Sequence, residues 1–261
     1  MRLSYSLTIL MAAVITLLPE HGLAVEYQPA RIGEHDTSIA KLIRFPDIPG
    51  DISLYLRCEA KVSPGGAIDE VGCYDEEKID RAFYRAVNIA AGNATVTAAK
   101  VDGKPVRILM LFSVMFRQIG EQRAIAVVPN HGTNSKELGL SYIAPQRYGY
   151  NSNMYAPRTE LGLLWVDAHM SELGQAQNVS YLRTKWTNKE TRRYAKSYIS
   201  DSNFIPGHLN GEPFPMRFVK PIFGHRNGFM WLRNDSRCGN SSMVCEETSK
   251  ASGRPRYVFD D

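Results

Sequence analysis

The chain contains an internal repeat, which restricts its possible folds more than any other feature. Shifted by 108 positions, residues 54–116 align with residues 162–224 without a gap. The identical pairs fall at one turn, one helix face and a second turn: Leu56/Leu164, Ala60/Ala168, Ser63/Ser171, Gly66/Gly174, Val71/Val179, Arg85/Arg193, Gly103/Gly211 and Pro105/Pro213. A repeat of this period predicts one supersecondary unit that occurs twice.

The first copy reads as strand, turn, strand, helix and strand. Apolar and polar residues alternate over 54–62, which is typical of a half-buried strand, and 63–66 form a turn. A returning strand holds Ile68, Val71 and Cys73. Asp75 is predicted to cap a helix that ends at 92–93. The helix has one apolar face: Ile79, Ala82, Phe83, Ala86, Val87 and Ala90. A second turn at 102–105 precedes an apolar strand, 106–116.

The second copy repeats this order. A strand at 164–170, a turn at 171–174 and a return at 179–182 precede a capping box at 187–190. The helix that follows is predicted to bury Thr191, Tyr194, Ala195, Tyr198 and Ile199. Pro213, Pro215 and Pro221 lack a backbone donor, so the last strand, 214–223, is predicted at a sheet edge. The fold class predicted is α+β, with two strand–strand–helix–strand units, each a small antiparallel sheet with one helix on one face.

These units leave four flanking segments. Residues 1–24 have Arg2, an apolar run and a small-x-Ala end, the pattern of a cleaved signal peptide; an uncleaved anchor is the alternative. The predicted organisation is then a leader at 25–51, unit 1 at 52–117, a connector at 118–159, unit 2 at 160–224 and a disulfide-containing C-terminal segment at 225–261. A cleaved signal predicts a periplasmic protein without stable membrane insertion.

The four cysteines are even in number, as expected of an exported chain with disulfides. Three connectivities are possible, and local spacing favours Cys58–Cys73 and Cys238–Cys245. A hairpin that turns at Gly65–Gly66 places Cys58 opposite Cys73, within the reach of a disulfide. The alternative, a metal site, is disfavoured because neither pair has CxxC spacing.

The second copy resembles the C-terminal domain of TonB, the envelope energy transducer. The resemblance rests on the order of elements together with residues 204–207, Phe-Ile-Pro-Gly, and 210–213, Asn-Gly-Glu-Pro. The first copy keeps Asp-Gly-Lys-Pro at 102–105 but not the Phe-x-Pro motif. The chain lacks the Pro-rich spacer that TonB proteins carry. The resemblance implies a non-catalytic adaptor related to TonB-dependent transport, which engages envelope or outer-membrane receptor segments by strand addition. The binding edge expected from it comprises Pro213, Phe214, Met216, Phe218 and Val219.

An alternative function is a secreted metal-dependent hydrolase. Asp167 and His169 lie two apart on one predicted strand, and His208 could approach them as a third ligand. The counterparts of these residues in the first copy are Glu59, Lys61 and Lys100, which favours a solvated sheet face instead. The chain has none of the common hydrolase or phosphate-loop motifs, so we expect no catalytic residue, metal or cofactor. A basic run from Arg183 to Lys196 is read as an exposed helix face, with nucleic acid not expected as a partner.

The strand at 106–116 is long and apolar and contains no proline. An open strand of this kind would aggregate, so it must be paired, either with a partner peptide or with the other unit. We expect the two units to lie edge to edge around a pseudo-two-fold axis through this strand. The sequence leaves the oligomeric state open.

Overall fold

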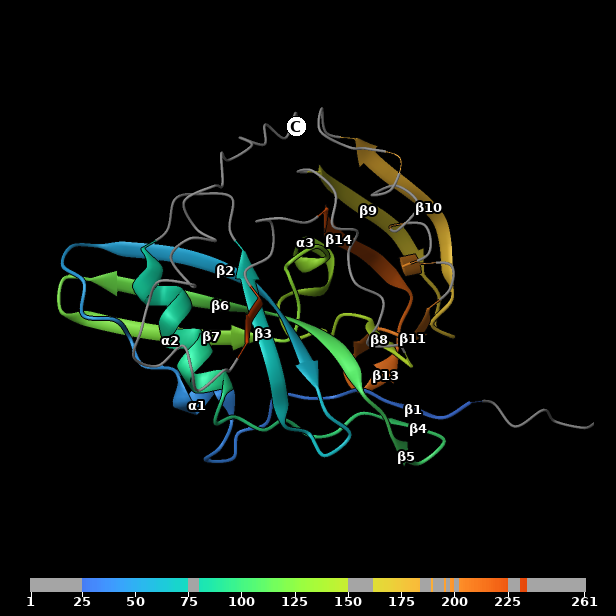
Figure 1. Ribbon diagram of the computed structural model, residues 1–261, viewed down its shortest axis with the longest axis horizontal. Helices are drawn as coiled ribbons and strands as arrows, with labels where there is room; N and C mark the ends of the chain where they lie inside the picture. Colours follow the sequence, from blue (N-terminus) through green and yellow to red (C-terminus); the bar gives the residue numbers. More distant parts are fainter. Residues whose placement is uncertain are drawn as a thin grey trace, which may run out of the picture.

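The computed structural model describes residues 25–74, 80–149, 162–183, 189, 195, 198–199, 202–224 and 231–233. These residues form a strand-rich α+β fold with several antiparallel sheets (Figure 1). The predicted signal peptide and the predicted Cys238–Cys245 disulfide lie outside them. No helix in the described part of the chain is long and apolar enough to cross a membrane.

The largest sheet has the order β11-β8-β6-β2-β3-β15, and β7 pairs with β6 beside β8. A second sheet has the order β10-β9-β14. The strands of these two sheets are β2 (Ile52–Val62), β3 (Ile68–Tyr74), β6 (Ile108–Ile119), β7 (Gln122–Val128), β8 (Gln146–Tyr148), β9 (Gly162–Met170), β10 (Ala176–Arg183), β11 (Asn203–Ile205), β14 (Met216–Gly224) and β15 (Trp231–Arg233). Small sheets join β1 (Tyr27–Gln28), β4 (Lys100–Val101) and β5 (Lys104–Pro105), and join β12 (His208–Leu209) with β13 (Glu212–Pro213).

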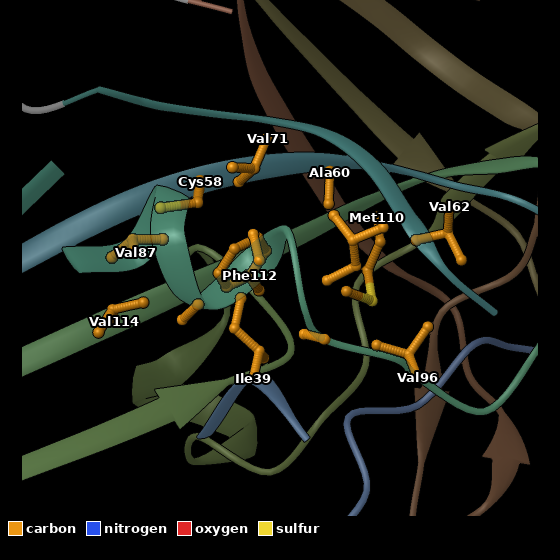
Figure 2. Packing of buried hydrophobic residues seen from close by; sticks show 14 of the residues in the cluster. Ile39, Cys58, Ala60, Val62, Val71, Val87, Val96, Met110, Phe112 and Val114 are labelled. Atoms are coloured by element: carbon orange, nitrogen blue, oxygen red, sulfur yellow. The ribbon is translucent and has the colours of Figure 1, made fainter. Parts of the chain in front are cut away.

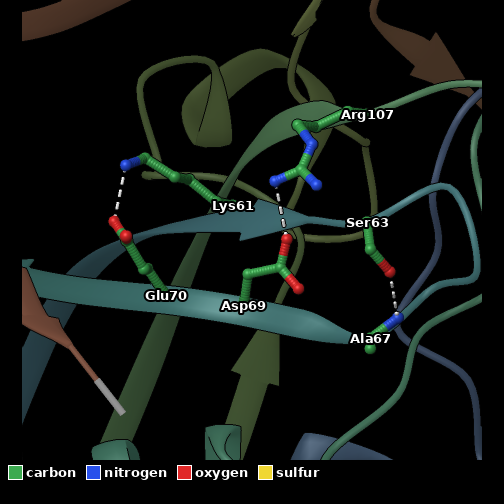
Figure 3. A network of polar contacts seen from close by, with 6 residues as sticks. All are labelled: Lys61, Ser63, Ala67, Asp69, Glu70 and Arg107. Atoms are coloured by element: carbon green, nitrogen blue, oxygen red, sulfur yellow. Dashed lines mark hydrogen bonds and ion pairs between the residues drawn. The ribbon is translucent and has the colours of Figure 1, made fainter. Parts of the chain in front are cut away.

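The β2–β3 hairpin follows its predicted alternation and carries the predicted disulfide. Cys58 lies opposite Cys73, with a Cα–Cα distance of 4.0 Å. The inward residues Leu56, Cys58, Ala60 and Val62 are all fully buried. On the outer face, Lys61 pairs with Glu70 at 2.5 Å and Arg107 pairs with Asp69 at 2.8 Å (Figure 3).

Helix α2 (Arg81–Ala91) begins later than predicted. Asp80, not Asp75, is the N-cap, since its side chain accepts a hydrogen bond from the Ala82 amide at 2.8 Å. The helix ends at Gly92 as predicted. It packs its apolar face on the largest sheet (Figures 1 and 2), where Phe83 contacts Phe116 with ring centroids 4.9 Å apart. Short helices α1 (Ile39–Leu42) and α3 (Ser135–Leu138) lie in the leader and in the expected connector.

Strand β6 is buried on both faces. Met110, Phe112 and Val114 belong to the core under α2, which Figure 2 shows in part. Leu109 and Leu111 point the other way, into a second core with Val166, Phe204 and Phe218. Burial on both faces explains the unbroken apolar run, because neither face needs polar residues.

Two expectations about β6 need correction. Residues 118–149, expected within a connector, contain β7, α3 and β8, and both strands pair with β6. The second edge of β6 is therefore covered by β7 and β8, and not by an edge of the second copy. The edge-to-edge arrangement around a pseudo-two-fold axis was wrong; the residues of the predicted second unit pack on the face of β6 through Leu109 and Leu111. The sequence did not predict β7, because most of its residues are exposed and they show no clear alternation of apolar and polar residues.

Candidate functional site: two sheet edges and a hollow

The predicted binding edge lies on β13 and β14. Pro213 and Phe214 are exposed and Val219 is half-buried, whereas Met216 and Phe218 are 2% and 3% exposed and belong to the second core. β14 forms one side of its three-stranded sheet, as its prolines predict. The backbone of β14 is thus at an edge, but two of the five candidate side chains, Met216 and Phe218, are core residues.

Part of the β14 edge is already occupied. The Asn134 side-chain amide donates to the backbone carbonyl of Arg217 at 2.9 Å, and the Tyr142 hydroxyl accepts from the Asn134 backbone N–H at 3.1 Å. The cavity that Asn134 and Tyr142 form with Phe218 and Val219 of β14 has a volume of only ≈ 10 Å³. A further strand could pair here only by displacing Asn134.

The three residues of the metal hypothesis are not gathered into a ligand set. Arg217 binds Asp167 with two hydrogen bonds, at 3.0 and 2.6 Å. His169 is exposed, whereas His208 is buried and bonds the Pro206 carbonyl through Nδ1 at 2.9 Å. Burial lowers the pKa of His208. No group of three His, Cys, Asp or Glu side chains within the described ranges could hold a metal ion.

Strand β10 forms the opposite edge of the same sheet. Among the described residues it pairs only with β9. Its register shifts between Gln177 and Ser180, where Asn178 has a φ of 51°. Bulges of this kind are common at sheet edges. Val179, beside the bulge, is 36% exposed.

The direction of the β10 backbone groups follows from β14. The Arg217 carbonyl points away from β9, since it binds Asn134. Backbone direction alternates along each strand, so the backbone of its partner His169 points toward β10, and that of Asp167 does the same. Ser180, opposite Asp167, then bonds inward. We therefore expect the N–H and C=O groups of its neighbours in the extended strand, Val179 and Tyr181, to face outward from the sheet edge.

A hollow of ≈ 360 Å³ lies where β10 begins. It opens between the 171–175 turn, β11, and two tyrosines, Tyr27 and Tyr148, whose rings lie 6.4 Å apart. None of its lining side chains in the described part of the chain is charged. Burial, together with Tyr27, raises the pKa of Tyr148 to about 12, so its hydroxyl stays protonated.

A buried polar chain supports the floor of the hollow. Ser202 lines the hollow, and its hydroxyl accepts a hydrogen bond from Arg147 Nε at 2.6 Å. The Arg147 guanidinium lies 4.2 Å from the Tyr198 ring centroid. Lys220 donates to the Tyr198 hydroxyl at 2.8 Å and to the Glu59 carboxylate. Burial raises the pKa of Tyr198, so its phenol remains neutral. Ser202 is thereby tied to β14 and β2.

No family model, curated protein or solved structure matches this chain.

Sequence reasoning missed the hollow and the β10 edge. Tyr27 and Tyr148 lie in the segments expected as leader and connector, and nothing in the sequence brings them together. One signal did exist: Val179 is an apolar residue among polar neighbours on a strand with irregular alternation. Such a break indicates a bulge or an exposed apolar position.

Proposed function

We propose that this protein is a non-catalytic binding protein of the cell envelope that holds an extended protein segment by strand addition along β10. One observation carries the proposal: the equivalent edge in the first half, that of β3, already takes an added strand. β15 pairs there through Trp231–Gly72, Leu232–Val71 and Arg233–Glu70. In strand addition, backbone hydrogen bonds supply much of the affinity.

The equivalence of β3 and β10 rests on our further proposal that the chain holds two copies of one strand–strand–helix–strand unit. The strand pairings support it. Leu54–Phe116 and Val62–Ile108 pair between β2 and β6, and 108 residues later Gly162–Gly224 and Met170–Met216 pair between β9 and β14. The hairpin pair Cys58–Cys73 has Val166–Tyr181 as its counterpart.

The turns support the two copies independently of the sheets. Gly66 and Gly174 have φ angles of 85° and 72°, and a Cβ on either would meet a carbonyl oxygen, of Val96 and Phe204 respectively. Asp102 and Asn210 also have positive φ, 49° and 53°. Each of these pairs is 108 residues apart. The helical positions Val87, Ala90 and Ala91 are buried, as are their counterparts: Ala195, Tyr198 and Ile199.

The outward backbone groups agree between the copies. The short Cα–Cα distance of Cys58 and Cys73, 4.0 Å, is that of a pair without mutual hydrogen bonds, so the backbone groups of Cys73 and of Val71 face outward. Val71 is where Leu232 pairs. Its counterpart is Val179, for which the alternation starting from β14 also implies an outward direction. We therefore place binding on β10 in preference to the β14 edge, where Asn134 holds the Arg217 carbonyl.

An envelope location is supported by the Cys58–Cys73 disulfide, because disulfides persist in oxidising compartments. We propose that the protein is periplasmic and that it binds in the manner of TonB. Its proposed partners are segments of envelope or outer-membrane proteins.

Hydrogen exchange of the whole protein with bound peptide tests the proposal. Linear peptides selected on the full chain from a phage-displayed library are expected to slow exchange at the amides of Val179 and Tyr181. Val179→Pro, which removes an outward N–H, is expected to weaken binding at least tenfold, and Val179→Ala, which keeps it, much less. Ser180, whose amide already bonds β9, serves as the internal reference for exchange. Selected peptides that leave β10 exchange unchanged would refute strand addition here.

A further inference from the structure

From the hollow beside β10 we infer a specificity pocket that receives one uncharged side chain of the added segment. This inference rests on the proposed strand addition. The hollow continues the β10 edge, because Gln175, Ala176 and Val179 line it. A strand paired with the outward groups of Val179 would therefore run past its mouth.

The first half shows why the hollow is an opening and not a packing defect. There, Ala67 bridges to Thr95, and the Ile68 amide approaches the Ala94 carbonyl at 3.5 Å. The counterparts 108 residues later are Gln175 with Asn203 and Ala176 with Ser202. All four of these line the hollow. The positions whose backbones meet in the first half therefore border the hollow in the second.

The turn beside the hollow is fixed in place. Gly174, with a φ of 72°, lies so close to β11 that a Cβ would come within 2.0 Å of the Phe204 carbonyl oxygen. The Ser171 hydroxyl also accepts from the Gln175 amide at 3.1 Å. Because this end of the turn is anchored, the hollow is preformed, which lowers the cost of binding.

The lining combines apolar and uncharged polar side chains. Ile199 and Phe204 are 3% and 2% exposed. Tyr27, Tyr148 and Ser202 add hydroxyl-bearing side chains to the lining. Since Ser202 Oγ accepts from Arg147, its own proton is available to a carbonyl or hydroxyl of the ligand. Such a site suits a side chain with an apolar body and a hydrogen-bonding end, such as tyrosine or glutamine.

Charge provides the discrimination. A lysine in the hollow would lose water, meet no opposite charge among the described lining residues and approach the Arg147 guanidinium that binds Ser202. Desolvating an unpaired charge is costly, so lysine should be rejected. Leu173 stands at the rim and is 58% exposed, so it can be replaced without disturbing the core.

The test uses a peptide that protects Val179 and Tyr181, with each of its positions changed in turn to lysine. One position is expected at which lysine weakens binding at least tenfold to the full chain. Leu173→Asp is expected to restore much of that loss for the lysine peptide and not for an aspartate peptide. Ile89→Asp, at a residue 62% exposed on α2, is the matched control and should restore nothing.

The outcomes separate this inference from the proposed function. If β10 stays protected but no position is sensitive to lysine, or if Leu173→Asp rescues none, the pocket is refuted and strand addition stands. If no peptide protects β10, strand addition itself fails. Binding of a neutral oligosaccharide in the hollow, detected as shifts of the Tyr27 and Tyr148 ring signals, would identify a different occupant and overturn the inference.

Discussion

The ammonium group of Lys220 on β14 donates a hydrogen bond to the carboxylate of Glu59 on β2, 161 residues earlier. Both side chains are buried, 7% and 2% exposed. This ion pair joins the two sheets across the face of β6, where only a buried opposite charge makes either group tolerable.

Removing one partner of this pair should therefore be far worse than removing both. Lys220→Met is expected to lower the free energy of unfolding by about 3–5 kcal/mol, because Glu59 would be left buried and unpaired. The double variant Glu59→Leu/Lys220→Met should lose much less than the sum of the single losses. Urea unfolding of the unchanged protein, of Glu59→Leu, of Lys220→Met and of the double variant gives the coupling; additive losses would contradict a mutually dependent pair.

Gly174 should be much less replaceable than Gly211, although both have positive φ. The Cβ added by Gly211→Ala meets no atom within 4 Å. The free energy of unfolding should therefore fall by only about 1–2 kcal/mol, the cost of a positive φ for alanine. Gly174→Ala adds a contact with the Phe204 carbonyl and should lose about 2–5 kcal/mol. Gly66→Ala and Gly103→Ala form the same comparison in the first half. Equal melting temperatures for the two members of either pair would show that the turn does not press on its neighbour.

The Cys58–Cys73 disulfide should stabilise the β2–β3 hairpin substantially. Its reduction is expected to lower the free energy of unfolding by about 2–5 kcal/mol. A Cys238→Ala/Cys245→Ala background leaves this disulfide as the only one that reductant can break. Thermal unfolding with and without reductant measures the effect, and an unchanged melting temperature would be the contrary result.

His131 should make stability depend on pH. Its Nε2 lies 2.8 Å from the Cys58 carbonyl, which requires a proton on that nitrogen in the neutral ring. Burial lowers its pKa to about 3 from 6.5. Between pH 3 and 6.5, the imidazole of His131 therefore binds a second proton in the unfolded chain but not in the folded chain. The free energy of unfolding should fall by about 1.4 kcal/mol per pH unit as the pH drops from 6.5 toward 3.

Comparison with His131→Gln isolates this contribution from other titrating groups. The variant should be less stable at pH 7.5 but should lose the part of the pH slope that belongs to His131. Urea unfolding between pH 4.5 and 7.5 measures both proteins. Identical slopes would mean that His131 is accessible to protons in the folded state.

Much of the local structure followed from sequence patterns. The alternation over 54–62 predicted β2, and a turn at Gly65–Gly66 predicted that Cys58 lies opposite Cys73. Both predictions were possible because period-two patterns and turn residues depend on local sequence. The cap at Asp80 was missed, because Asp75 and Asp80 are both able to cap and a pattern cannot choose between them.

The sequence by itself determined the strand alternation and turn of the first hairpin and the cysteine pair that the hairpin carries. Only the tertiary structure decided that β7 and β8 cover β6, that Glu59 meets Lys220, and that Tyr27 and Tyr148 border one hollow. The reason is physical. A residue pattern records whether a position is buried, but which distant segment buries it depends on how the whole chain packs.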